Sequence, residues 1–346
     1  MARWTPLLFI GLAAGTYAYR PLFESAKRPV RHVIVPKEIG SLKSEACGAC
    51  HEKIYAQWKL SRHALAWTNA GFKASFKREP RNWCIHCHAP LPAQMAEVRD
   101  FPEVGAAPSP LADEGINCAT CHVRDGAVLS THASPDAPHP VRVDPRLGSS
   151  TFCGECHQFN FPLGGAGPIT YAADPMQDTL AEWKGSHFAR RASCQSCHMA
   201  GGDHRSPGAH DAAYVKPALR LAVARSKGLV RVELRTHGVA HRFPTGDMFR
   251  RVTVEICADS KCTKPVAADA FQRIFQPTKT HFTLLRDTAV PAPLKGEEAA
   301  RILEIRVPAE AAKLYYRITY RLAAEDNEAE VEGSDRAIEL FAGAVP

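Results

Sequence analysis

The chain has 346 residues, of which 45% are hydrophobic and 23% are charged. This balance excludes a mainly disordered chain, and the length suits two or three folded soluble domains. The formal net charge of +7 would ordinarily suggest an anionic partner, such as nucleic acid or a membrane surface.

The N-terminus carries an apolar stretch, residues 6–19, between Arg3 and Arg20. This stretch is shorter than the roughly 20 residues that a helix needs to cross a bilayer, and it resembles the h-region of a secretory signal. We interpret residues 1–19 as a signal peptide, with an uncleaved N-terminal membrane anchor as the alternative. Both interpretations predict an exported, periplasmic or extracellular protein, and residues 20–43 are predicted to be a linker.

One cysteine pattern dominates the next part of the chain, residues 44–216. Ten of the 12 cysteines fall in C-x-x-C-H sequences, whereas chance would give roughly 0.02 copies in a chain of this composition. The five copies contain the cysteine pairs Cys47 and Cys50, Cys84 and Cys87, Cys118 and Cys121, Cys153 and Cys156, and Cys194 and Cys197.

This spacing is typical of covalent haem attachment. Two thiols three residues apart reach the two vinyl groups of one haem, and the histidine that follows lies beneath the iron. A single copy would leave a redox dithiol or half of a zinc site open, but five copies behind an export signal do not. We therefore predict five haem c groups, with these proximal ligands: His51, His88, His122, His157 and His198.

Five bound haems would offset most of the positive net charge of the chain. Each haem brings two propionates and one positive ferric core, so five contribute about −5 and leave the holoprotein near neutral. No nucleic-acid partner is predicted.

The region from 44 to 216, the haem region hereafter, is rich in glycine and proline. We expect short helices and loops wrapped around stacked haems, because haem faces replace the usual side-chain core. One internal echo is visible: Trp58 to His63 resembles Trp183 to His187, and both segments are predicted to be helical.

The remaining residues, 217–346, show a different pattern and are called the β region. Apolar residues alternate with polar ones, which is typical of strands with one buried face. An all-β, sandwich-like domain is predicted. At least five strands are expected, around Leu219–Val223, Val230–Leu234, Val252–Ile256, Leu303–Val307 and Leu314–Leu322.

Cys257 and Cys262 are not part of any haem motif. In an oxidising compartment they are expected to form a local disulfide at the end of a strand, with a metal or redox role as the alternative.

The sixth iron ligands must come from the 11 other histidines. His63 lies 12 residues beyond His51 on a predicted helix, about 18 Å away, so it is expected to reach a neighbouring haem. The same argument applies to His187, 11 residues before His198. We predict that His63 and His187 are distal ligands.

Three further distal ligands are predicted in loops. His139 is chosen after the third motif, with His132 as the alternative, and His210 after the fifth motif, with His204 as the alternative. His241 lies in the turn His241-Arg242-Phe243-Pro244-Thr245-Gly246. It is predicted to project from the β region onto a haem, although a purely structural turn is an equal alternative.

Several of these residues carry a resemblance to a known family. The first motif followed by Tyr55, Trp58, Ser61 and His63 resembles the opening of multihaem cytochromes of the hydroxylamine oxidoreductase superfamily, including its tetrahaem electron-acceptor cytochromes. The segments 152–158 and 183–199 are also similar to that group, and the resemblance covers roughly residues 44 to 212.

The resemblance implies closely stacked haems with mostly bis-histidine ligation and distal histidines from remote segments. It also implies that His63 serves a haem other than its nearest. The His-x-Phe-Pro-Thr-Gly turn looks like a module appended to various exported multihaem cytochromes. The chain departs from the tetrahaem pattern in its five motifs and its β region, and it lacks the C-x-x-C-K site of pentahaem nitrite reductases.

Three functions are compatible with this sequence. The leading hypothesis is electron transfer between a redox protein donor and an acceptor, which needs no catalytic residue. The second is an oxidoreductase in which one haem keeps an open sixth position for a small nitrogen or sulfur compound. The third is a subunit of an extracellular cytochrome assembly, with membrane attachment through the N-terminus or self-assembly through the β region.

Overall fold

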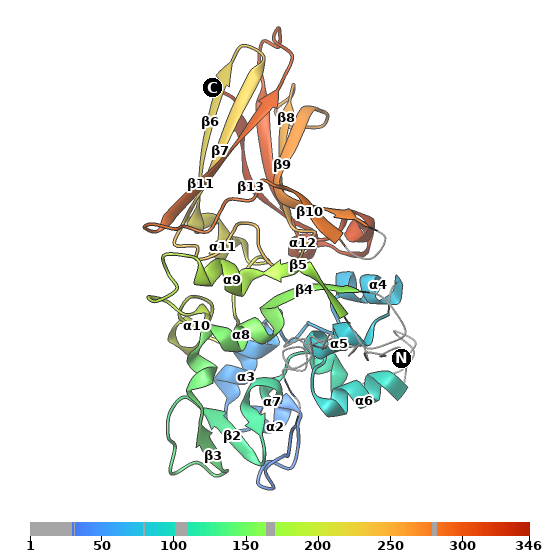
Figure 1. Cartoon of the computed structure of the whole chain (residues 1–346), viewed down its shortest axis with the longest axis vertical. Helices are drawn as coiled ribbons and strands as arrows, with labels where there is room; N and C mark the ends of the chain where they lie inside the picture. The colour runs from blue at the N-terminus through green and yellow to red at the C-terminus, as the bar shows by residue number, and fades with distance from the viewer. Residues whose placement is uncertain (1–29, 31, 79, 101–109, 164–169, 279–281) are drawn as a thin grey trace, which may run out of the picture.

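The computed structural model describes residues 30, 32–78, 80–100, 110–163, 170–278 and 282–346. The interpretation of residues 1–19 as a signal or anchor therefore lies outside the described residues. Short helices occupy one half of the molecule and long strands the other, as Figure 1 shows. Within the described ranges, no helix combines the length and the apolar character that crossing a membrane would require.

The helices of the haem region are short, and several are built around the cysteine motifs. They are α2 (Ser44–Gly48), α3 (Glu52–Lys59), α4 (Ala70–Arg78), α5 (Asn82–His88), α6 (Pro92–Asp100), α7 (Cys118–His122), α8 (Ser150–His157), α9 (Thr179–Lys184), α10 (Cys194–His198) and α11 (Ala212–Val215). Single 3₁₀ turns connect them: η1 (Ala112–Glu114), η2 (Pro145–Gly148), η3 (Ala200–Gly202) and η4 (Lys216–Ala218). Trp58 and Trp183 lie in α3 and α9, as predicted, but these helices end at Lys59 and Lys184, so His63 and His187 lie in turns beyond them.

Two small sheets complete the haem region. One has the order β1-β2-β3, and the other is the antiparallel pair β4 and β5. Their bounds are β1 (Val123–Arg124), β2 (Ala127–Ser130), β3 (Val141–Val143), β4 (Gln158–Leu163) and β5 (Thr170–Asp178).

Two larger sheets form the β region. One has three strands in the order β11-β7-β6, and the other has five in the order β10-β9-β8-β12-β13. Their bounds are β6 (Leu219–Ser226), β7 (Leu229–His237), β8 (Arg251–Cys257), β9 (Pro265–Pro277), β10 (Phe282–Asp287), β11 (Glu298–Arg306), β12 (Tyr315–Arg321) and β13 (Ala337–Ala344). Two short turns, η5 (Glu325–Glu330) and α12 (Gly333–Arg336), precede β13.

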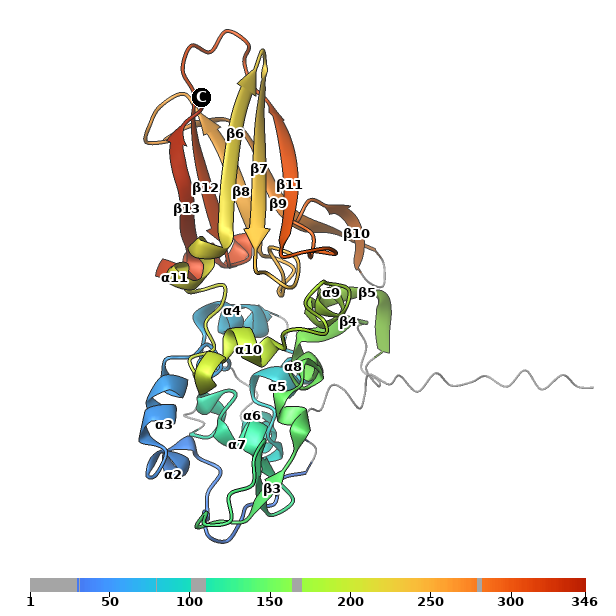
Figure 2. The same cartoon turned by 90° about the vertical axis from the view of Figure 1, so that its left-hand side faces the viewer.

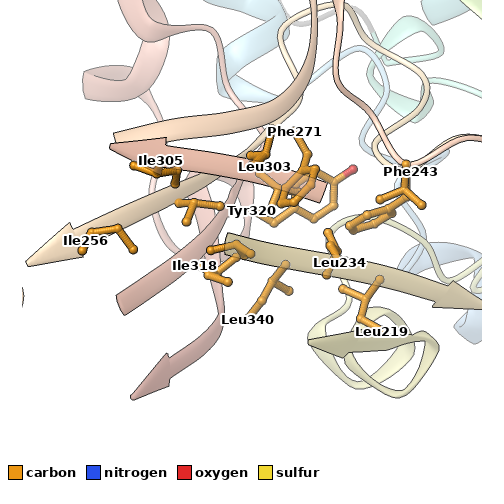
Figure 3. Packing of buried hydrophobic residues seen from close by; sticks show 14 of the residues in the cluster. Leu219, Leu234, Phe243, Ile256, Phe271, Leu303, Ile305, Ile318, Tyr320 and Leu340 are labelled. Atoms are coloured by element: carbon orange, nitrogen blue, oxygen red, sulfur yellow. The ribbon is translucent and has the colours of Figure 1, made fainter. Parts of the chain in front are cut away.

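A single hydrophobic core lies between these two sheets (Figure 3). Leu234 of β7 and Leu303 of β11 meet Ile256 of β8, Phe271 of β9 and Ile318 of β12. Alternate residues of β7 are buried and exposed, because successive side chains of a strand point to opposite faces. The period-two pattern of the sequence therefore predicted the strands that build this core.

All five predicted strands are present, as β6, β7, β8, β11 and β12. The sequence reasoning missed β9, β10 and β13. In β9 the small residues between Pro265 and Ala270 weaken the contrast between the two faces, and β13 contains a register shift opposite Ile318 and Thr319.

Cys257 and Cys262 form a disulfide, which confirms the expected local bridge. Cys257 is the last residue of β8, and both cysteines are buried. The bridge closes the turn that leads from β8 to β9.

Replacing both cysteines by alanine is expected to lower the free energy of unfolding of the β region by about 2 kcal/mol, because this short loop loses its cross-link. Urea unfolding followed by circular dichroism measures the change. Wild-type protein in a thiol reductant serves as the control and should show the same loss, since thiols cleave the disulfide but not the thioether bonds to haem. An unchanged midpoint in the double variant would contradict the prediction.

The haem region and the β region lie end to end (Figure 2), and polar side chains join them. Thr245, in the turn after β7, donates a 2.6 Å hydrogen bond to Glu182 of α9. Arg62 forms a 2.7 Å ion pair with Asp335 of α12. Residues of the β region are therefore held against the haem region at α9 and at the turn that follows α3.

Candidate haem-binding cavity

Local helical structure orients the cysteines of each motif. The second to fifth motifs each end a helix, and their histidines are the last helical residues, His88, His122, His157 and His198. Residues three apart lie on the same face of a helix, so the two thiols of a motif point to the same side. His51 of the first motif instead precedes α3.

All five motifs open into one cavity of about 2550 Å³. A pocket for one small ligand has about 300–1,000 Å³, so this cavity has room for several large groups. Its lining includes all ten motif cysteines and the five motif histidines. Five more histidines line it: His63, His139, His204, His210 and His241.

Three pairs of histidine rings face each other at nearly equal separations. A histidine nitrogen lies about 2 Å from a metal that it ligates, and the ring centre about 1 Å further, so two axial rings lie about 6 Å apart. The observed centre-to-centre distances are 6.4 Å for His63 and His157, 6.3 Å for His122 and His204, and 6.3 Å for His198 and His241.

In six of the histidines that line the cavity, the ring nitrogen Nδ1 contacts a backbone carbonyl oxygen. Because a carbonyl only accepts, Nδ1 carries the proton and Nε2 is free to bind a metal, as is usual for ligating histidines. The contacts are His88 with Ala66 (2.6 Å), His122 with Leu129 (2.8 Å), His198 with Pro207 (2.7 Å), His204 with Gly202 (2.8 Å), His210 with Ser334 (3.0 Å) and His241 with Arg242 (2.9 Å).

Burial favours the neutral form of several histidines that line the cavity. Burial lowers the pKa of His157 and of His241 to about 4. Burial also lowers the pKa of His63, His88 and His122 below the ordinary histidine value. A histidine must be unprotonated to bind a metal, so the residues present fit axial ligation of haem iron.

Thiols from different motifs touch each other. Three pairs hydrogen-bond: Cys47 with Cys118, Cys153 with Cys194, and Cys156 with Cys87. The acceptor role lowers the pKa of Cys118 to about 7 and that of Cys194 to about 6. Neighbouring motifs therefore present their attachment atoms side by side.

Two of these pairs are built by the same set of contacts. Ser44 Oγ accepts from the backbone N–H of Cys118 at 3.4 Å, and Ser150 Oγ accepts from that of Cys194 at 3.0 Å. Each serine lies three residues before the first cysteine of its own motif, Cys47 in one case and Cys153 in the other.

Trp58 and Trp183, from the two similar segments of the sequence, belong to the same repeated arrangement. The indole of Trp58 donates to the carbonyl of Ile116 and that of Trp183 to the carbonyl of Ala192, both at 2.8 Å. Each acceptor lies two residues before the first cysteine of the partner motif. The first and third motifs are thus arranged like the fourth and fifth.

Only some of the predicted distal ligands face a motif histidine. His63 and His241 face a motif histidine, and His139 and His210 line the cavity without such a close ring. In the part of the chain that the structure describes, neither His51 nor His88 forms a histidine ring pair of this kind.

Two expectations change in the light of this geometry. His187 does not line the cavity; its backbone N–H donates to Pro293 of the β region. It directly follows Ser186, whereas one residue separates Ser61 from His63, so the two histidines occupy different positions in the turns that follow α3 and α9. His204, which the sequence offered only as the alternative to His210, faces His122 instead.

Gly115 allows the chain to approach His63 closely. Its backbone has a φ of +57°, and a Cβ there would lie 2.6 Å from the carbonyl oxygen of His63. Only glycine avoids both the strained conformation and the backbone collision.

Gly115→Ala is expected to destabilise the haem region by about 1–3 kcal/mol and to displace His63, because the new Cβ meets backbone atoms. Electron paramagnetic resonance of the oxidised holoprotein should show partial loss of one low-spin signal. Gly201→Ala is the matched control, since Gly201 also has a positive φ but has nothing within 4 Å of a Cβ. Equal spectra for both variants would argue against this role.

Comparisons with known proteins agree with the motifs. The family model described as cytochrome c554 and c-prime matches residues 46–123, which hold the first three motifs. A penta-heme cytochrome c552 from Thermochromatium tepidum has a similar fold, with a TM-score of 0.64 and 21% identity over 89% of this chain and 98% of that chain. No match is found among curated proteins.

The structural match is too long to be confined to the haem region, which is half of the chain. It therefore includes much of the β region as well. With the five motifs and the shared cavity, these likenesses support a multihaem c-type cytochrome.

Proposed function

We propose that this protein is an exported pentahaem c-type cytochrome that carries electrons between redox partners through closely spaced, mostly bis-histidine haems. Residues 44–216 form its haem domain and residues 217–346 a sandwich-like β domain. The single observation that carries the proposal is the set of three facing histidine pairs in a cavity lined by all five motifs. When bound, haem supplies one-electron chemistry, and the chain sets axial ligands, spacing and burial.

The contacts between motif cysteines support a continuous path. The first motif touches the third, the fourth touches the fifth, and the second touches the fourth. The charge of Cys121 in the third motif raises the pKa of Cys153 and of Cys156 in the fourth, so these motifs are neighbours too. All five attachment sites are therefore connected, with the fourth at the branch point.

The axial ligands follow from the ring pairs. We assign His63 to the iron of His157, His204 to that of His122, and His241 to that of His198. His139 and His210 are the lining histidines left for the irons of His51 and His88. The Nδ1 of His139 is buried without a partner among the described residues, unlike the Nδ1 atoms of the six histidines that contact carbonyls.

A second candidate function rests on one specific observation. Neither His51 nor His88 has a facing histidine ring in the described residues, which favours an open iron at one of these two sites. A small nitrogen or sulfur compound could then bind there, and the protein would be an oxidoreductase.

Low-temperature electron paramagnetic resonance of the oxidised holoprotein, with carbon monoxide added to the reduced form, separates the two functions. Electron transfer alone predicts five haems per chain, only low-spin signals and no carbon monoxide binding. A high-spin signal with carbon monoxide bound to one haem would favour the oxidoreductase. A protein without covalent haem would overturn both.

The proposal also covers partners and location. We propose redox protein partners, no nucleic acid, and export directed by residues 1–19. Membrane attachment predicts that the full N-terminus remains in the mature protein, which mass spectrometry of the exported protein measures. Self-assembly predicts filaments in light scattering, whereas a dilute monomer would count against it. The family-model match to residues 46–123 is compatible with membership of the hydroxylamine oxidoreductase superfamily, which we propose for the haem region.

A further inference from the structure

Arg250 is a cation of the β region that lines the haem cavity. It directly precedes β8. Its Nη1 donates to the carbonyl of Thr245 at 3.2 Å, and its guanidinium hydrogen-bonds the hydroxyl of Tyr320, a residue only 2% exposed. Gly246 leaves room for it, because a Cβ at that position would lie 2.8 Å from Nη1. These contacts fix the guanidinium.

The charge of Arg250 has no anionic partner within the described residues. Its Nε is buried and makes no hydrogen bond in that part of the chain. The nearby carboxylate of Asp247 accepts from the backbone N–H of Phe249 and forms no ion pair with Arg250. Arg250 is half-buried, and a buried guanidinium nitrogen without a hydrogen-bond acceptor is costly, so an anion is expected to complete the site.

Two nearby arginines, unlike Arg250, each have a carboxylate partner. Arg251 forms a 2.7 Å ion pair with Glu328. Arg242, in the His241 turn, likewise has Glu182 within 3.5 Å. Arg250 differs from both because it lies on the cavity side and lacks a protein carboxylate.

Arg250 contacts the turn that carries a proposed axial ligand. Its hydrogen-bond acceptor Thr245 lies in the same turn as His241, whose ring faces that of His198 in the fifth motif at 6.3 Å. The positive charge of Arg250 also contributes to the lowered pKa of His157, His210 and His241. The anionic groups that haem would bring to this cavity are its propionates.

We propose that Arg250 binds a propionate carboxylate of the haem attached at Cys153 and Cys156 or of the haem attached at Cys194 and Cys197. This inference rests on the proposed haem attachment. The guanidinium matches a carboxylate through paired N–H donors. By neutralising that carboxylate, Arg250 raises the reduction potential of the haem that carries it. The β region thereby contributes a potential-setting residue as well as an axial ligand.

Arg250→Gln in the full holoprotein tests the inference. We expect the same number of haems per chain, retained low-spin signals, and a shift to lower potential of one or both of these haems in a redox titration monitored by electron paramagnetic resonance. Arg306→Gln removes the same charge from an exposed position on β11 and should leave every potential unchanged. Equal potentials in wild type and Arg250→Gln, or equal shifts in both variants, would overturn the inference.

Two further arms complete the test. Arg250→Met replaces the glutamine variant if that protein is not recovered, with the same shift expected, and Arg250→Lys should retain most of the wild-type potential. A free anion is the rival occupant. Wild-type potentials that change on adding inorganic phosphate at constant ionic strength, with no such change in Arg250→Gln, would assign Arg250 to that anion and overturn the haem interaction. Absence of haem in wild type would instead refute the proposed function.

Discussion

His241→Ala is expected to convert one haem of the holoprotein from low-spin to high-spin ferric iron and to open that iron to carbon monoxide. The ring of His241 faces that of His198 at 6.3 Å and is inclined to it by only 11°. The Nδ1 contact with Arg242 leaves Nε2 free for the metal, and the described residues provide no second histidine at that position. Removing the imidazole therefore removes the sixth ligand.

Electron paramagnetic resonance and carbon monoxide difference spectra measure this change. His237→Ala is the matched control, because His237 is an exposed histidine at the end of β7 and does not line the cavity. The control should keep every low-spin signal. A fully low-spin spectrum of His241→Ala without carbon monoxide binding would mean that His241 is not an axial ligand.

The second large effect is expected in the β region. Phe271 of β9 is completely buried between the two sheets, where it packs in the core with Leu303 and Tyr320. Truncation of a buried phenylalanine leaves a cavity that the core fills only in part. Phe271→Ala should lower the free energy of unfolding of this region by about 3–5 kcal/mol.

Urea unfolding followed by circular dichroism measures the loss. Val266→Ala on the same strand is the matched control; this side chain is 43% exposed, and the expected change stays within about 0.5 kcal/mol. Because the β region holds His241, the unfolding that Phe271→Ala promotes should also convert the haem at His198 to high spin. If that haem stayed low-spin while the β region unfolded, the assigned ligand would be wrong.

The haem sites could be predicted from sequence because their chemistry is local. Two thioethers and the proximal histidine must come from five consecutive residues, so no knowledge of the fold is needed. The pairing of distal with proximal histidines, in contrast, depends on the fold. His204 and His122 are brought together only by the folding of the segments between them, and a sequence with several spare histidines offers no local signal for that choice.

His187 illustrates the limit more sharply. It shares a tryptophan and a serine with the segment of His63, and the two tryptophans do make equivalent hydrogen bonds in both places. The histidine differs by one position, which is enough to direct it away from the cavity. The repeat is preserved in the hydrogen bonds of Ser44, Ser150 and the two tryptophans rather than in a long run of similar sequence.

In the β region, periodicity identified the strands with large buried residues. It failed for β9, where alanines and polar residues blur the pattern, and for β13, whose alternation is broken by a register shift. The junction between the two regions was also beyond sequence reasoning, apart from the expectation that His241 would project onto a haem. Glu182 gives no sign in the sequence that it binds the turn containing Thr245.

The thiol contacts between motifs have a consequence for how the protein is made. Cys47 and Cys118 touch in the folded chain, and so do Cys153 and Cys194. In an oxidising compartment, a chain that folded before receiving its cofactors could join these sulfurs as disulfides, and each such bond would block two attachment sites at once. Under the proposed export and haem attachment, loading the ten reduced cysteines while the motifs are still apart would avoid these disulfides, with assembly of the cavity as the last step.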